Sequence, residues 1–174
     1  MRHSFPHPSR TLLGAAISCL LVAMMPAQAA TATTTFQVTA TVLKACAMTT
    51  PATLAFGDYT PSNVAPLAGT TAFSVICTFG TPYSLGLSAG TSTSASVTTR
   101  KMTNAGGVTG SNLLSYGLFK EVGLSTNWDD SATGAGYTAN GLTQPYTVYG
   151  SIPAGQYGAA PGNYADTITL TLTY

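Results

Sequence analysis

Few side chains in this sequence could take part in catalysis or hold a metal. The histidines are His3 and His7, and the cysteines are Cys19, Cys46 and Cys77. Ser-His-Asp and Cys-His catalysis and the common zinc sites all draw on these two residue types. Which of them remain in the working protein depends on how the N-terminus is processed.

The first 29 residues have the pattern of a secretory signal peptide. Arg2 and Arg10 precede an apolar run over residues 12–25, and Ala27 and Ala29 then fit an A-x-A cleavage site. The run is shorter than the ~20 residues that a membrane-spanning helix needs. We therefore expect residues 1–29 to be removed on export, together with both histidines and the first cysteine. Catalytic triads and common zinc sites are then excluded.

Cys46 and Cys77 remain after this cleavage. Two cysteines in an oxidising compartment predict one disulfide, the alternative being two reduced thiols. By the loop-entropy estimate, closing a loop of about thirty residues stabilises a fold by roughly 3 to 4 kcal/mol. We expect the disulfide to be structural.

The carboxylates offer little support for an enzyme. They are Asp58, Glu121, Asp129, Asp130 and Asp166. A glycosidase would need two of them to face each other across a substrate, but the adjacent Asp129 and Asp130 are interpreted as solvated loop residues. The alternating oxygen ligands of a calcium loop are absent. We expect no metal or other cofactor, and an enzyme is the least favoured of three functional classes.

Two other features allow alternative interpretations. Trp128 and the tyrosines could form a sugar-binding platform, but we favour a core or loop anchor because such rings fill sandwich cores routinely. Arg100 and Lys101 form a positive cluster that is too small to bind nucleic acid. We interpret them as a solvated edge strand whose charges prevent aggregation.

The elements that position these residues are predicted to be strands. Beyond residue 29 the chain alternates short β-rich runs with Gly, Pro and Asn, and shows no helical periodicity. Only 6% of the chain is charged. The fold class is therefore all-β, and strands spaced by turns over about 145 residues suggest one immunoglobulin-like β-sandwich. The predicted strands span residues 35–42, 54–59, 70–77, 83–89, 100–102, 114–119, 146–152 and 165–174, with a long loop and one short strand between 120 and 145.

The first of these strands needs a partner. Phe36, Val38, Ala40 and Val42 form an apolar face, and polar residues alternate with them. A strand at a free N-terminus must bury that face against the rest of its own domain or against a neighbouring copy. These two possibilities imply different functions.

The last strand is the most regular in the sequence. Its apolar face comprises Ile168, Leu170, Leu172 and Tyr174, and threonines occupy the other face. An immunoglobulin-like sandwich normally ends with a strand paired against its penultimate one. No sequence remains after Tyr174 to supply it, so we expect a sandwich that lacks its last strand.

A set of short segments, in this order, resembles the spore coat protein U-like domain family, the secreted subunits of archaic chaperone-usher pili. The last two segments carry most of the resemblance. The segments are Cys46, LAFGDY at 54–59, Cys77-Thr78, LSAG at 87–90, RKM at 100–102, LSYGLF at 114–119, YGSIPAGQ at 149–156 and GNYADTITLTLTY at 162–174.

The resemblance implies an incomplete immunoglobulin-like sandwich that is completed by a donor strand from another subunit. Residues 30–43 would be the donor extension, with Phe36, Val38, Ala40 and Val42 inserted into the groove of a neighbouring copy. Residues 44–174 would form the pilin domain, its acceptor groove flanked by the last strand. A periplasmic chaperone, an outer-membrane usher and other pilin subunits would be the partners, without nucleic acid, and the fibre would serve adhesion or biofilm formation at the cell surface.

The alternative is a self-contained secreted β-sandwich that binds carbohydrate or coats a surface. Residues 35–42 would then pair within their own domain.

Overall fold

A computed structural model describes residues 28–130 and 136–174. Nearly all of the predicted signal peptide lies outside these residues. The chain divides into two units, Met1–Ala40 and Thr41–Tyr174, and we refer to the second as the body. No helix within the described ranges is long and apolar enough to cross a membrane.

Within its described residues the body contains eight strands in two sheets, which confirms the all-β prediction. The larger sheet has the order β1-β2-β7-β5-β4, and the smaller has the order β6-β3-β8. The strands are β1 Cys46–Met48, β2 Leu67–Cys77, β3 Pro82–Leu87, β4 Arg100–Thr103, β5 Leu113–Phe119, β6 Tyr137–Thr138, β7 Gln144–Ile152 and β8 Leu170–Thr173.

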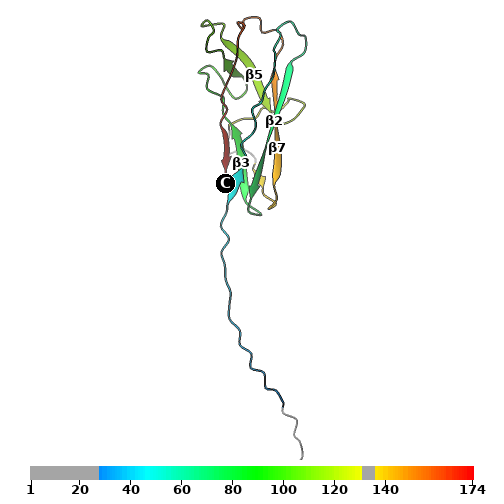
Figure 1. Ribbon diagram of the computed structural model, residues 1–174, viewed down its shortest axis with the longest axis vertical. Coiled ribbons are helices and arrows are strands. Elements are labelled where there is room, and N and C mark those ends of the chain that lie inside the picture. The colour runs from blue at the N-terminus through cyan, green and yellow to red at the C-terminus, as the bar shows by residue number, and fades with distance from the viewer. Residues whose placement is uncertain (1–27, 131–135) are drawn as a thin grey trace, which may run out of the picture. The chain divides into compact units, whose positions relative to one another are not determined.

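The long antiparallel pair β2–β7 is the centre of the larger sheet (Figure 1). It runs in continuous register from Leu67 opposite Ile152 to Val75 opposite Gln144. Phe73, Val75 and Cys77 alternate with exposed or half-buried residues, as expected for a strand with one face on the core. Both strands were predicted from their alternation, although each begins two or three residues earlier than the sequence indicated.

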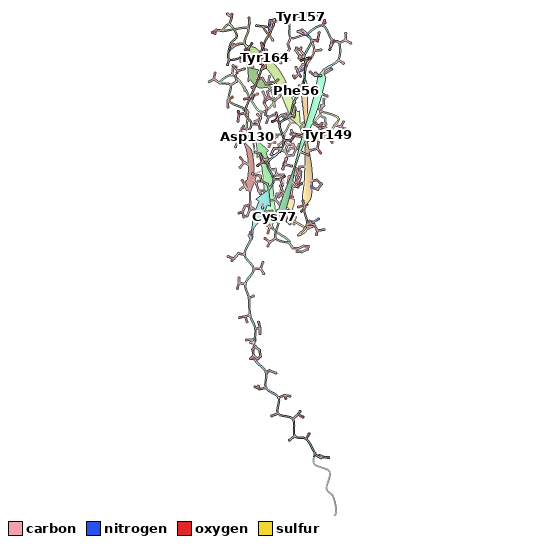
Figure 2. All side chains as sticks on the ribbon, in the orientation of Figure 1. Phe56, Cys77, Asp130, Tyr149, Tyr157 and Tyr164 are labelled. Carbon is pink, nitrogen blue, oxygen red and sulfur yellow. A yellow bond between two sulfur atoms is a disulfide. The ribbon has the colours of Figure 1, made fainter. Side chains whose placement is uncertain are left out.

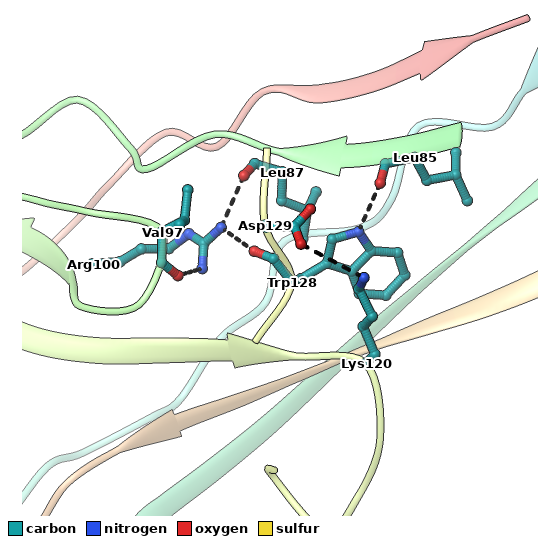
Figure 3. Close-up of polar contacts among 7 residues, drawn as sticks. All are labelled: Leu85, Leu87, Val97, Arg100, Lys120, Trp128 and Asp129. Atoms are coloured by element: carbon teal, nitrogen blue, oxygen red, sulfur yellow. Dashed lines mark hydrogen bonds and ion pairs between the residues drawn. The ribbon is translucent and has the colours of Figure 1, made fainter. Parts of the chain in front are cut away.

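An aromatic cluster joins the two sheets. Phe73 of β2 lies 5.4 Å from Tyr146 of β7 and 5.9 Å from Trp128, measured between ring centroids. Tyr137 of β6 lies 5.1 Å from Tyr146 and 5.4 Å from Tyr83 of β3. Trp128 is 2% exposed and its indole N–H points to the Leu85 carbonyl (Figure 3). Its interpretation as a core anchor is confirmed, and a sugar platform at Trp128 is excluded.

The predicted disulfide is confirmed. Cys46 and Cys77 are bonded and stand opposite each other where β1 pairs with β2. β1 is a three-residue edge strand, and its hydrogen bonding continues on either side: the Thr78 N–H donates to the Ala45 carbonyl and the Thr49 N–H to Ser74. The disulfide therefore fixes the start of the body to its central ladder.

Two strand predictions within residues 44–174 need correction. The segment 54–59 has no assigned strand, although its apolar residues pack against the core. The last strand is shorter than predicted: β8 covers Leu170–Thr173, and Ala165 makes only a single bridge, with Thr103 of β4. Among the described residues of the region 120–145, β6 is the short strand that was predicted, and β7 already begins at Gln144.

The solvated edge expected at Arg100 is wrong. β4 does lie at the edge of the larger sheet, but Arg100 is 0% exposed. Its guanidinium donates to the carbonyls of Leu87 at 2.9 Å and Trp128 at 2.6 Å (Figure 3). It also donates to the carbonyls of Ser88 and Val97. Burial lowers the pKa of this guanidinium. Its positive charge is stabilised by main-chain dipoles rather than by water.

We predict that Arg100→Met lowers the free energy of unfolding by about 3 to 5 kcal/mol, because four inward-facing carbonyls lose their donor. Denaturant titration of the purified chain at neutral pH measures this. The neighbouring Lys101 is only half-buried and reaches Ser94 on the surface, so Lys101→Met should change stability by no more than about 0.5 kcal/mol. Equal losses in the two variants would contradict the role given to Arg100.

Candidate functional site: an open sheet edge

β8 forms one edge of the smaller sheet, and β3 is its pairing partner there. The Ser88 N–H donates to the Thr169 carbonyl at 3.0 Å and continues the register in which Leu87 stands opposite Leu170. In an antiparallel ladder, the residues that bond to the partner alternate with residues whose N–H and C=O point the other way. The backbone groups of Leu170 and Leu172 therefore face away from β3.

The side chains of this edge are half-buried. Ile168, Leu170 and Leu172 pack against the core but keep part of their surface exposed, and Tyr174 is 57% exposed. The intervening threonines are exposed, as the alternation predicted. The edge therefore offers both hydrogen-bonding groups and apolar surface to an incoming strand.

The segment 54–59 packs on the inner face of the larger sheet. Leu54 and Phe56 cover Gly69 of β2 and Gly150 of β7, which stand opposite each other in the ladder. A Cβ at Gly150 would come within 2.7 Å of Phe56 Cζ, and one at Gly69 within 3.0 Å of Leu54 Cδ2. The two glycines therefore create the space into which Leu54 and Phe56 insert.

The segment 54–59 and the last segment of the chain both contact Tyr116 of β5. The Phe56 ring meets the Tyr116 ring at 6.2 Å, edge to face. The Tyr116 hydroxyl donates to Asp166 Oδ2 at 2.7 Å, and Asp166 Oδ1 accepts from the backbone and hydroxyl of Thr91. Tyr116 is 5% exposed, and burial together with the bond to Asp166 raises its pKa. The segment 54–59 and the segment that leads into the last strand are thus anchored to one side chain.

The predicted donor residues are exposed. Phe36 is 87% exposed, and Val38 and Val42 are each 82% exposed. Residues 28–45 have no assigned strand. The insertion of residues 35–42 into another copy stays a prediction.

No group of three or more His, Cys, Asp or Glu side chains within residues 28–130 and 136–174 could hold a metal ion. Asp129 is half-buried and lies 4.0 Å from Lys120, whereas Asp130 is exposed. The chemistry that the described site offers is strand pairing.

Comparison with known proteins identifies the family. The profile of the spore coat protein U domain matches residues 32–171, most of the chain. The chain belongs to the spore coat protein U domain family. It is also 38% identical over 167 residues to Protein U of Myxococcus xanthus, covering 88% of this chain and 91% of that protein.

The fold of this spore coat protein U domain also occurs in a solved structure. It is similar, with a TM-score of 0.50 and 20% identity, to a chain in the CsuC–CsuE chaperone–tip adhesion subunit pre-assembly complex of the archaic chaperone-usher Csu pili of Acinetobacter baumannii. The match covers 77% of this chain and 40% of the matched chain. At this identity the similarity establishes the fold.

Sequence reasoning missed three features that hold the spore coat protein U domain together around this edge. These are the hydrogen bonding of Asp166 to Tyr116, the insertion of Leu54 and Phe56 over two glycines, and the burial of Arg100. The glycines at 69 and 150 were a usable signal, because a glycine inside a strand often marks close approach by another segment.

We predict that Tyr116→Phe flattens the loss of stability at alkaline pH. The pKa of Tyr116 is raised by folding, so above about pH 10 the unfolded chain releases a proton that the folded chain retains, and stability falls as pH rises. The variant should be about 1 to 3 kcal/mol less stable at pH 7, through the lost hydrogen bond, but should lose less between pH 9 and pH 12.

Denaturant midpoints across this pH range measure the effect. Tyr157 is 73% exposed, so Tyr157→Phe is the matched control and should leave the profile unchanged. The prediction is refuted if the Tyr116→Phe variant loses as much stability between pH 9 and pH 12 as the wild-type chain does.

Proposed function

We propose that this protein is a structural subunit of a secreted pilus, assembled by the chaperone-usher pathway through donor-strand complementation, that supports adhesion or biofilm formation. The observation that carries the proposal is the open edge of β8, where backbone groups of Leu170 and Leu172 face away from β3. Their half-buried side chains leave apolar surface beside the same edge. Such an edge favours pairing with a strand from another chain.

The donor is residues 30–43. Phe36, Val38, Ala40 and Val42 share one strand face, and their exposure in the single chain makes them available to another copy. The family match begins at residue 32 and therefore includes most of this segment. Side-chain burial and ladder hydrogen bonds must together offset the cost of ordering the strand.

The partners follow from this assembly route. A subunit with an open edge needs a temporary strand before it polymerises, which a periplasmic chaperone would lend, and an outer-membrane usher would then exchange it for the donor of the next subunit. The similarity to a chain from a chaperone–pilus subunit complex supports this role. The protein would pass through the periplasm to a pilus at the cell surface and act without enzymatic activity.

The runner-up is a self-contained secreted sandwich that binds carbohydrate or coats a surface. The family description as a spore coat domain favours the coating role. In that case residues 35–42 would pair within their own domain. Amide hydrogen exchange of the isolated mature chain separates the two: protection of 35–42 in a monomer supports the coat protein.

We predict that deleting residues 30–43 abolishes polymerisation and leaves a folded subunit that still binds its chaperone, because the donor is lost and the open edge is kept. Size-exclusion chromatography and electron microscopy of the purified product measure this. Replacing 35–42 by Gly and Ser at equal length is the matched control for length and should also fail to polymerise. Fibre formation by either variant would contradict the proposal.

We also predict that the two faces of the donor respond differently to a carboxylate. Phe36→Asp should slow polymerisation by about tenfold or more, because burying an unpaired carboxylate costs several kcal/mol. Val38→Asp should do the same. Gln37→Asp places the same charge on the opposite face and should stay close to the wild-type rate, as followed by the rate of fibre growth. Equal slowing by Phe36→Asp and Gln37→Asp would argue against strand insertion.

A further inference from the structure

Exposed apolar side chains gather at both ends of the β2–β7 ladder. Phe79 follows β2 and Leu142 precedes β7, while Val64 precedes β2 and Tyr157 follows β7. All four are at least 67% exposed. Because β2 and β7 are antiparallel and in register, Phe79 and Leu142 lie at one end, and Val64 and Tyr157 at the other. Figure 2 shows Tyr157 and Cys77, the last residue of β2, at opposite ends of the body.

Phe79 and Leu142 lie on two loops that are bonded to each other. The Gly80 N–H donates to the Ala139 carbonyl at 2.8 Å, and the Ala139 N–H donates to Thr81. The Phe79 Cβ lies 3.6 Å from where a Cβ at Gly141 would stand. We call this surface the Phe79–Leu142 patch.

Val64 and Tyr157 also lie on connected loops. The Gly155 N–H donates to the Pro61 carbonyl at 3.1 Å, and the Tyr59 hydroxyl donates to Pro153 at 2.8 Å. Residues 63–67, which include Val64, line an open hollow. We call this surface the Val64–Tyr157 patch.

The extension joins the body beside Phe79. The Ala45 carbonyl accepts from the Thr78 N–H at 2.9 Å, and the Ala45 N–H donates to Thr78 Oγ1 at 2.9 Å. If Val42 is seated in another copy, residues 43–45 span at most about 10 Å between that copy and Thr78. The two bodies must then meet at the Phe79–Leu142 patch.

Strand direction determines which end of the acceptor they meet. β3 begins near the Phe79–Leu142 patch, at Pro82, and runs away from it, so the antiparallel β8 runs back toward it. A donor antiparallel to β8 runs away from that end again and brings Val42 to the end that carries Val64 and Tyr157.

We propose that the Phe79–Leu142 patch of one copy packs against the Val64–Tyr157 patch of the next copy along the fibre. The partner is a second copy of this chain, and the inference rests on the proposed function. The contact joins two different surfaces, so it repeats along an open filament rather than closing into a ring. It fixes the angle between successive bodies, which donor exchange alone leaves to a three-residue connection.

Cross-linking within assembled fibres tests the contact. A chain carrying Phe79→Cys and Val64→Cys should form a ladder of covalent multimers after mild oxidation of its fibres, on gels without reductant. The native cysteines do not compete, because Cys46 and Cys77 are bonded to each other. The matched control pairs Phe79→Cys with Ala72→Cys, since Ala72 is exposed in the middle of β2, and should give no ladder.

A second measurement uses the double variant Phe79→Ser with Leu142→Ser. Its fibres should form but bend more, with a persistence length at least halved in electron micrographs, whereas Ala72→Ser fibres keep the wild-type value. The inference is overturned if the wild-type chain forms fibres but the variant with Phe79→Cys and Val64→Cys gives no ladder. It is also overturned if both cysteine pairs give equal ladders. In either case the pilus proposal still stands. Absence of fibres from the wild-type chain would overturn both.

Discussion

The backbone edge of β8 is the constraint on which the remainder of this structure depends. Backbone N–H and C=O groups that point away from a sheet need water or another strand, and at β8 they lie next to half-buried apolar side chains that water solvates poorly. The segment 54–59 covers the inner face of the larger sheet with its side chains and has no assigned strand, so it adds no strand to either sheet. One strand is enough to satisfy both requirements.

Contacts away from this edge stabilise the body. Arg100 connects the end of β3 to the loop around Val97 and to Trp128 through four carbonyls, and the aromatic cluster joins the sheets near β6. Asp166 positions the start of the last segment by accepting from Tyr116 and Thr91. These contacts use main-chain acceptors and single polar side chains, consistent with a chain in which 6% of residues are charged.

The sequence predicted the fold class, the disulfide and most strand positions, because alternation and turn residues are local signals. It failed at 54–59, where an alternating pattern packs over Gly69 and Gly150 without a strand partner. It also failed at Arg100, because a charged side chain is expected to be exposed to solvent. The carbonyls that surround this guanidinium come from several separate segments, which the sequence alone does not bring together. The alternation of residues 165–174 predicted the strand that forms the open edge, whereas the Tyr116–Asp166 hydrogen bond beside it joins segments that are distant in sequence.

The position of the Cys46–Cys77 disulfide has a mechanical consequence for any fibre joined through residues 30–43. Tension along such a fibre enters each body at Ala45, one residue before β1, and β1 is held to the sheet by only a short edge ladder that could be peeled open. The covalent bond passes the load directly to Cys77 at the end of β2, the strand with the longest pairing in the body. The pull is thereby spread over the central ladder in shear, so the edge strand does not have to resist unzipping.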